Sequence, residues 1–460
     1  MSGYDIVIIN GTVVDPESCR TTVANIGISE GKIKAVARRE LAGETVIDAA
    51  GKIVCPGFID IHAHVEGNAA CAEFMAAMGV TTVYNGNCGL SPDDFDAFFE
   101  KYEREGFLIN QVEQAGHTML RNSVGLTDRY RPADARQIAD MEAKLEHAFQ
   151  CGVWGLSFGL EYCPGSSKEE VLALSKIAAK YGKMVSIHTR TDMFAGLESL
   201  KEAIDITRLT GAAVNISHLV YQFGFGMAKQ AVALIEDATR QGLDISVDSG
   251  VYCDFATAIG TAVFDDGCVE KWGCGYDSIV AATGKYRGMR LTKEQFLEMR
   301  RDTPTDTAIA LVGHENEIYE ILERPYVMMS TDAGTMYDNS LPGHPQDAGS
   351  YPRFFKKLVR EQNRLSLPDA VRRCTYLPAK RLGLESKGRI KDGADADIVI
   401  FDLKTIEDKA QFPCYGSTSE RPEGIDWVIV GGKVAVKGKE LLPGANSGKV
   451  LRGHNALWEM

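Results

Sequence analysis

The sequence predicts an α/β fold in which a (β/α)8 TIM-like barrel carries a small composite β-sandwich domain built from both termini. Short β segments occupy the first 55 residues, and similar short β segments return after residue 383. Between these flanks, β-branched apolar segments alternate strictly with helical patterns. This alternation favours parallel strands joined by crossover helices, and eight such strands close a barrel. We therefore expect three parts: 1–55 and 384–460 for the small domain, and 56–383 for the barrel.

The terminal segments are short and are separated by turn-forming residues. The dipeptide Asn10-Gly11 predicts a tight hairpin, because both residue types accept a positive φ. A Gly-Gly pair separates the last two segments in the same way. The expected strands are Tyr4–Asn10, Thr12–Val14, Ile26–Ile28, Lys32–Val36, Thr45–Asp48, Asp397–Asp402, Trp427–Val430 and Lys433–Val436.

The central region contains eight strand candidates and one long interruption. Helical patterns such as DARQIADMEAKLEHAFQ and KEEVLALSKIAAKY lie between the strands. The stretch Asp254–Arg324 exceeds an ordinary connection and includes the helical LTKEQFLEMRR, so we expect an insertion that acts as a lid or specificity loop. The strand candidates are Phe58–His64, Val80–Cys88, Leu108–His117, Trp154–Glu161, Met184–His188, Val214–His218, Asp244–Asp248 and Val327–Asp332.

Composition excludes several classes of protein. The 460 residues are 45% hydrophobic and 25% charged, which is typical of a globular protein with a large core. A net charge of −13 without a basic stripe argues against nucleic acid as a partner. The N-terminus lacks the features of a signal peptide, and no apolar run approaches the ~20 residues of a membrane span. We therefore predict a cytoplasmic protein that acts on a small molecule, and leave open whether its copies associate.

The cysteines do not indicate a disulfide framework. Eleven cysteines are scattered without CxxC pairs, which in a chain of this size favours free, buried thiols.

Each predicted barrel strand ends in a residue that can bind a metal or move a proton. In a parallel barrel the carboxyl ends of the strands share one face, where active sites lie. We therefore expect these side chains to converge. They are His62 and His64, Cys88, His117, Glu161, His188, His218, Asp248 and Asp332.

The pair His62 and His64 gives the first indication of a metal site. Alternation along a strand places both imidazoles on the same side. Neutral imidazoles suit zinc, and His188 and His218 would add two more. A single strand-end histidine is equally compatible with a hydrogen-bonded core residue. Four such histidines together with Asp332 on the last strand favour a metal centre.

Longer motifs make the chain resemble a known family. GFIDIHAH, the later His188, His218 and Asp332, and the closing GRIKDGADADIVIFD resemble the amidohydrolase superfamily. Within it, GVTTVYNGNCG, GHTMLR, GLSFGLEYCPG, SIHTR, ISHL and SLPDAVRRCTYLPAKRLGL resemble the N-acyl-D-amino-acid deacylase (D-aminoacylase) family. The resemblance covers nearly the whole chain.

The resemblance implies a zinc enzyme, with one or two ions, that hydrolyses the amide of N-acylated D-amino acids. It assigns Cys88, His188 and His218 to a tighter metal site, and His62, His64 and Asp332 to a second site. Asp332 would take a proton from the attacking water and give it to the leaving nitrogen.

Other strand-end residues keep alternative roles open. Glu161 stands where relatives place a bridging residue, so it would either bridge two metals or pair with Arg190 or Arg121. His117 and Asp248 would orient metal ligands or form hydrogen bonds at the barrel mouth. His117 or Tyr252 would stabilise the oxyanion.

The chain departs from the family where the substrate carboxylate is held. Val220 and Gln346 occupy places where the family has a Lys and an Arg, and an uncharged Gln cannot replace a guanidinium fork. Arg190 remains, and Arg353 or Lys271 would have to compensate. Our candidates for substrate binding are Arg190, His117, Tyr252, Tyr221 and Gln346.

This departure keeps two alternatives open. One is a hydantoinase- or dihydroorotase-like hydrolase of cyclic amides or ureides that uses the same metal site, with Tyr221, Gln222, Tyr252 and Phe255 suiting a flat ring. The other is a non-catalytic barrel protein.

Overall fold

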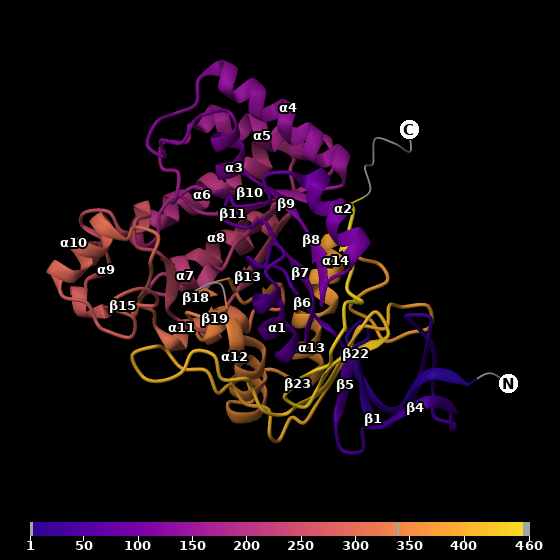
Figure 1. The fold of residues 1–460 in the computed structure, drawn as a ribbon. Helices are drawn as coiled ribbons and strands as arrows, with labels where there is room; N and C mark the ends of the chain where they lie inside the picture. The colour runs from indigo at the N-terminus through magenta and orange to yellow at the C-terminus, as the bar shows by residue number, and fades with distance from the viewer. Residues whose placement is uncertain (1–2, 335, 338–339, 454–460) are drawn as a thin grey trace.

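The computed structural model describes residues 3–334, 336–337 and 340–453. A barrel of parallel strands forms its centre, with the terminal sheet on one side and the predicted insertion on the other (Figure 1). Two runs of paired strands make up the barrel, in the orders β17-β13-β12-β11-β10-β9 and β8-β7-β6. A parallel bridge between Ala63 and Ala333 links the chain after β6 to the chain after β17. The predicted (β/α)8 fold is confirmed.

The barrel strands follow the predicted order. They are β6 (Phe58–Asp60), β7 (Val80–Tyr84), β8 (Asn110–Val112), β9 (Gln114–Gly116), β10 (Gly155–Gly159), β11 (Met184–His188), β12 (Val214–Ile216), β13 (Ile245–Ser249) and β17 (Val327–Met329).

The third strand differs from its prediction. Instead of one segment over Leu108–His117, β8 and β9 are separated by Glu113, and His117 begins the helix α3 (His117–Ser123). The reason is that the two parts pair with different neighbours: β8 with β7, and β9 with β10. The two parts together occupy the third position of the barrel.

The helices between the strands have clear start and stop signals. Helix α4 (Ala135–Cys151) begins with a capping box of Asp134 and Gln137 and ends at Gly152 in the left-handed conformation. Ser167 caps α5 (Lys168–Lys180). The other helices are α1 (Ala69–Ala77), α2 (Phe95–Glu105), α6 (Met193–Thr210), α7 (Leu219–Phe223), α8 (Ala228–Arg240), α12 (Gln346–Phe354), α13 (Leu367–Cys374) and α14 (Tyr376–Leu382).

Strands from both ends of the chain share one sheet of nine strands. Its order is β23-β22-β21-β20-β5-β1-β2-β3, with β4 paired to β1. The antiparallel pair β5–β20 joins the two halves. The strands are β1 (Tyr4–Asp15), β2 (Arg20–Ser29), β3 (Lys32–Ala37), β4 (Gly43–Asp48), β5 (Ile53–Pro56), β20 (Ile398–Phe401), β21 (Ile425–Val430), β22 (Lys433–Lys437) and β23 (Glu440–Leu441). Farther on, β24 (Val450–Leu451) pairs with the barrel strand β8.

The hairpin predicted at Asn10-Gly11 is wrong. Strand β1 runs through these residues, and Asn10 (φ 62°) forms a bulge in the pairing with β2. Gly11 is needed there for another reason, because a Cβ at this position would lie 2.4 Å from Cγ2 of Val54. The turn-forming pair therefore permits a close strand contact rather than a reversal of the chain.

The predicted insertion forms a lobe at the left of Figure 1. Its sheet has the order β14-β16-β15, and the pattern LTKEQFLEMRR lies in α10 as expected. The elements are β14 (Phe255–Ala258), α9 (Cys268–Trp272), β15 (Ile279–Ala281), α10 (Lys293–Asp302), β16 (Thr307–Ala310) and α11 (Glu315–Leu322). Within the described ranges, no helix combines the length and apolar character needed to cross a membrane.

Candidate metal centre and cavity

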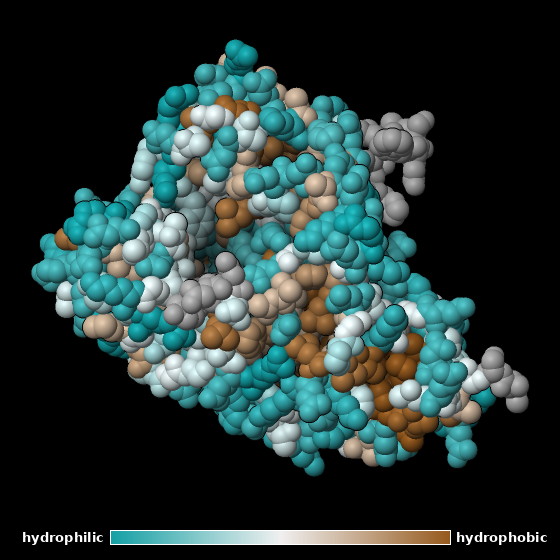
Figure 2. Space-filling model, in the orientation of Figure 1, coloured by the Kyte–Doolittle hydropathy of each residue, from teal (hydrophilic) through white to brown (hydrophobic). Residues whose placement is uncertain are grey.

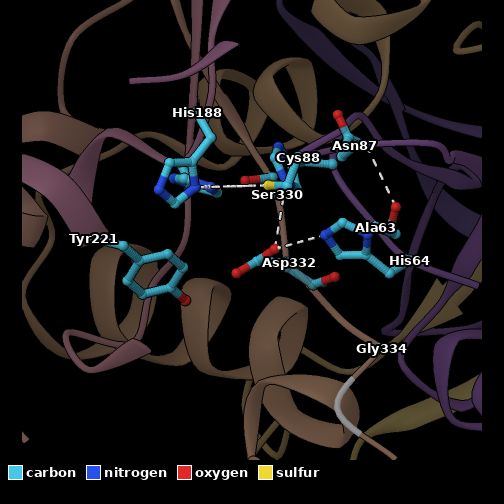
Figure 3. A network of polar contacts seen from close by, with 12 residues as sticks. Ala63, His64, Asn87, Cys88, His188, Tyr221, Ser330, Asp332 and Gly334 are labelled. Atoms are coloured by element: carbon cyan, nitrogen blue, oxygen red, sulfur yellow. Dashed lines mark hydrogen bonds and ion pairs between the residues drawn. The ribbon is translucent and has the colours of Figure 1, made fainter. Parts of the chain in front are cut away.

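The predicted metal ligands converge at the carboxyl ends of the barrel strands. His62 and His64 follow β6, Cys88 follows β7, His188 ends β11, His218 follows β12, and Asp332 follows β17. Figure 3 shows the side chains of His64, Cys88, His188 and Asp332 directed toward one another. Residues up to 270 positions apart in the chain (62 and 332) thus meet on one face of the barrel.

The ligand atoms form two groups that share Cys88: one with His62, His64 and Asp332, the other with His188 and His218. In the first, Oδ1 of Asp332 lies 3.3 Å from Nε2 of both His62 and His64, and Sγ of Cys88 lies 3.4 Å from Nε2 of His62. In the second, Sγ lies 3.4 Å from Nε2 of His218 and 3.7 Å from Nδ1 of His188.

These separations suit ligands around a small divalent ion. Zinc bonds of about 2.0–2.1 Å to nitrogen and about 2.3 Å to sulfur place tetrahedral ligands about 3.3–3.6 Å apart. Imidazole, thiolate and carboxylate are also the donors that zinc prefers. The donor set therefore fits a metal centre, and Cys88 belongs to both groups of donor atoms.

The electrostatics of the cluster also favour a bound metal ion. Burial would raise the pKa of the Cys88 thiol, but the neighbouring His62 and His218 hold it well below its usual value. Burial would likewise raise the pKa of Asp332, and hydrogen bonds from His62 and His64 keep it well below the ordinary value. A buried thiolate and carboxylate need positive charge close by, and a metal ion supplies it.

The backbone at three ligands is unusual. Cys88 (φ 52°), His218 (φ 32°) and Asp332 (φ 57°) all adopt the left-handed region. Non-glycine residues pay a conformational cost there, and such residues concentrate at functional sites. Each of the three follows a strand, so the strained turn directs the side chain inward over the barrel.

Asp248, near the end of β13, contacts chain segments that carry candidate ligands. Its Oδ1 accepts hydrogen bonds from the backbone N–H of His218 and from the hydroxyl of Ser330, and lies 3.6 Å from Nδ1 of His62. Asp248 thus positions two of the ligand-bearing segments, which agrees with the orienting role considered for it.

Glu161 lies outside both ligand groups. Its Oε2 lies 3.0 Å from Nε2 of His188, the nitrogen opposite the one that faces Cys88, and its Oε1 accepts a hydrogen bond from Lys271 at 3.2 Å. Its cation is therefore Lys271 rather than Arg190 or Arg121. Glu161 orients His188, and the insertion supplies its cation, because Lys271 also pairs with Asp192 at 2.7 Å.

A cavity of about 510 Å³ opens beside the metal ligands and is lined by His64, Cys88 and Asp332. Figure 2 shows the corresponding face of the molecule hollowed between the insertion and the upper helices. Ala256, Thr257, Ala258, Thr261 and Thr307 of the insertion line the cavity, which is the position expected for a specificity element. A smaller cavity on the side of His188 and His218 shares Tyr162, Ala256 and Asp332 with it.

Only one of the predicted substrate-binding residues lines either cavity. Tyr221 borders the smaller one, and its hydroxyl donates to Oε1 of Gln346. Gln346 is fully buried and donates from Nε2 to the backbone carbonyl of Asp332, so both ends of its amide are engaged within the protein.

The remaining candidates have partners within the protein. His117 lies 2.7 Å from Glu170, and Arg190 forms a two-pronged ion pair with Glu202. The Tyr252 hydroxyl contacts Asp408. Neither His117 nor Tyr252 lines the two cavities.

The cavity contains residues that the sequence did not single out. Tyr162 directly follows Glu161, so its position beyond a strand end was an available signal. Arg129 lies in the loop between α3 and α4, where no periodicity or motif marks it.

The fold and the site together define a barrel hydrolase with a metal centre at its carboxyl face. Residues 53–435 match the model of the amidohydrolase family, and the chain belongs to that family. The N-acyl-D-glutamate deacylase of Alcaligenes xylosoxydans xylosoxydans is 29% identical over 97% of this chain and 96% of its own. The D-aminoacylase of the same organism is 28% identical over 97% of each chain.

Solved structures agree with these relatives. The N-acyl-D-glutamate deacylase of Bordetella bronchiseptica, complexed with zinc and a phosphonate inhibitor that mimics the tetrahedral intermediate, has a TM-score of 0.88 and 26% identity, covering 98% of this chain and 100% of its own. A D-hydantoinase shares the fold alone, with a TM-score of 0.66 and 18% identity over 98% of this chain and 99% of its own.

Proposed function

We propose that this protein is a zinc-dependent deacylase that hydrolyses the linear amide of N-acyl-D-amino acids. One observation carries the proposal: Oδ1 of Asp332 lies 3.3 Å from Nε2 of both His62 and His64, beside a cavity of about 510 Å³. The carboxylate of Asp332 thereby lies next to the two histidines and to a cavity that can hold water and a small amide substrate. The named activities of the similar proteins favour a D-configured acyl amino acid.

The metal would be held by His62, His64, Cys88, His188, His218 and Asp332, as one or two ions. Zinc bound there supplies Lewis acidity, which lowers the pKa of water from about 15.7 to about 7 and polarises a carbonyl. Glu161 would orient His188, and Asp248 would orient His62 and His218. Neither would take part in making or breaking bonds of the substrate.

Asp332 would move the proton. It takes one proton from the attacking water and delivers it to the nitrogen of the leaving amine, so one carboxylate serves as base and then as acid. The hydrogen bond from Gln346 to its backbone carbonyl and the strained backbone at Asp332 hold the carboxylate over the cavity. The division into 1–55, 56–383 and 384–460 and a cytoplasmic location belong to the same proposal.

The test is a hydrolysis assay of the zinc-loaded protein. Substrates are N-acetyl-D-amino acids, their L enantiomers, and cyclic amides such as hydantoin and dihydrouracil, with Asp332→Asn as the blank. Metal content is measured on the same samples.

We expect turnover of D substrates with bound zinc, and a loss of turnover in Asp332→Asn while the protein stays folded. Turnover of rings alone would assign the site to cyclic amides and contradict the deacylase proposal. Absence of bound metal and of all turnover would favour a non-catalytic barrel.

A further inference from the structure

The cavity beside the metal ligands is lined by two cations, Arg121 and Arg129, and they differ in their partners. Nη1 of Arg121 donates to Oε1 of Glu170 at 2.6 Å, and its Nη2 donates to the backbone carbonyls of Asp128 and Arg131. Arg121 is 1% exposed. Its charge is therefore neutralised within the protein wall.

Other cations considered for substrate binding are neutralised as well. Lys271 pairs with Glu161 and Asp192, Arg190 pairs with Glu202, and Arg353 pairs with Asp408 and Glu315. A carboxylate ligand would have to displace an existing carboxylate at each of these residues.

Arg129 has no such counterion. Its Nη1 donates to the backbone carbonyl of Gly260 at 3.0 Å, and no carboxylate oxygen lies within 4.0 Å of its guanidinium in the described part of the chain. Its own backbone carbonyl accepts from the N–H of Gly165 at 2.9 Å. These two contacts tie Arg129, which lies in the α3–α4 loop, to the loop between β10 and α5 through Gly165 and to the insertion through Gly260. Among the described residues, the Gly260 carbonyl is the one hydrogen-bond partner of its guanidinium, which leaves most of its five N–H donors available.

We infer that Arg129 binds the carboxylate of the substrate. The inference rests on the proposed function and names its substrate class: an anionic acyl amino acid whose carboxylate is held from the α3–α4 loop. A half-buried guanidinium with a free donor fork matches a carboxylate in a two-pronged arrangement. This assignment accounts for the uncharged residues at the barrel, because Val220 is fully buried and Gln346 is committed to Asp332.

The experiment compares Arg129→Met, Arg129→Lys and Arg131→Met in the zinc-loaded protein. Arg131 is the matched control, because it lies in the same loop, is exposed and does not line the cavity. Each variant is assayed with N-acetyl-D-amino acids and with the corresponding carboxamides, after circular dichroism shows that it is folded.

We expect kcat/KM for the carboxylate substrates to fall about 10- to 150-fold in Arg129→Met, mainly through KM, because hydrogen bonds to a charged group are worth about 1.5–3 kcal/mol. Arg129→Lys, which keeps the charge but not the fork, should lose less. The carboxamides should be cleaved equally by the wild type and Arg129→Met, and Arg131→Met should match the wild type. An equal loss for both substrate classes, or no loss, overturns the inference.

Failure of the proposed function can be distinguished from failure of this inference. If the wild type cleaves none of the acyl amino acids, the same compounds are titrated calorimetrically. Binding to the wild type that is lost in Arg129→Met supports Arg129 as the anion site of a protein with another reaction. No binding, or equal binding by both proteins, overturns it.

Discussion

Replacing Glu170 with Gln should strongly destabilise the protein. Glu170 is the third residue of α5 and is fully buried, with Oε1 accepting from Nη1 of Arg121 at 2.6 Å and lying 2.7 Å from Nε2 of His117. Burial would raise its pKa, but the contacts with His117 and Arg121 outweigh burial and hold the pKa at about 2. Relative to an ordinary value of 4.5, this corresponds to roughly 3 kcal/mol.

The same magnitude follows from the partner that would be left behind. Glu170→Gln keeps the shape of the side chain but leaves the guanidinium of Arg121 buried without a counterion. Removing one partner of a buried ion pair costs about 3–5 kcal/mol. Because Arg121 also binds the backbone carbonyls of Asp128 and Arg131, the loop that carries Arg129 should loosen at the same time.

Guanidinium denaturation of the wild type, Glu170→Gln and Glu169→Gln measures this effect. Glu169 is the neighbouring residue in the same helical turn and is exposed, so its change should alter the free energy of unfolding by less than about 1 kcal/mol. We expect a loss of about 3–5 kcal/mol for Glu170→Gln. A loss as small as that of Glu169→Gln would refute the reasoning, because it would mean that the charge of Glu170 contributes nothing to holding Arg121.

Three further predictions concern the metal ligands and the dependence on pH. Cys88→Ser should remove most of the bound zinc and the hydrolytic activity, because both ligand groups lose their shared thiolate; elemental analysis that finds unchanged zinc would contradict this. Glu161→Gln should weaken zinc binding about 10- to 100-fold, measured by competition with a chelator, because His188 loses its charged partner; unchanged affinity would leave Glu161 without an orienting role. Since the folded pKa of Glu170 lies below its unfolded value, the stability that it contributes is present above pH 4.5 and should be lost as the pH falls toward about 2, whereas Glu170→Gln should lack this loss; parallel stability curves for the two proteins would argue against it.

The barrel and the convergence of the candidate metal ligands could be predicted because their signals are local. Alternating strands and helices are visible in short windows, and a histidine or cysteine directly after a strand indicates the face on which it lies. Cys88 was an exception. Its thiol is not distinguishable from a buried structural cysteine without the family motif around it, and the positive φ that directs it inward has no counterpart in the residue type.

Contacts between distant segments could not be predicted in the same way. The bulge at Asn10 depends on how β1 pairs with β2, and the split third strand depends on which neighbour each half pairs with. The partner of Glu161 comes from the insertion, 110 residues later in the chain, so the sequence offered Arg190 and Arg121 as equally plausible cations. Pairing choices of this kind depend on three-dimensional distances that the order of residues does not contain.

The candidate metal ligands and the proposed carboxylate-binding residue lie on different parts of the fold. The candidate metal ligands end or directly follow barrel strands, whereas Arg129 lies on a connecting loop and is fixed to the insertion through Gly260. Loops and insertions change in length and composition without disturbing the strand ends that hold the metal. If the anion site lies in the loop, the substrate carboxylate is displaced from the strand-end positions 220 and 346 toward the insertion. The distance between that carboxylate and the scissile amide, rather than the metal chemistry, would then decide which acyl amino acids the protein accepts.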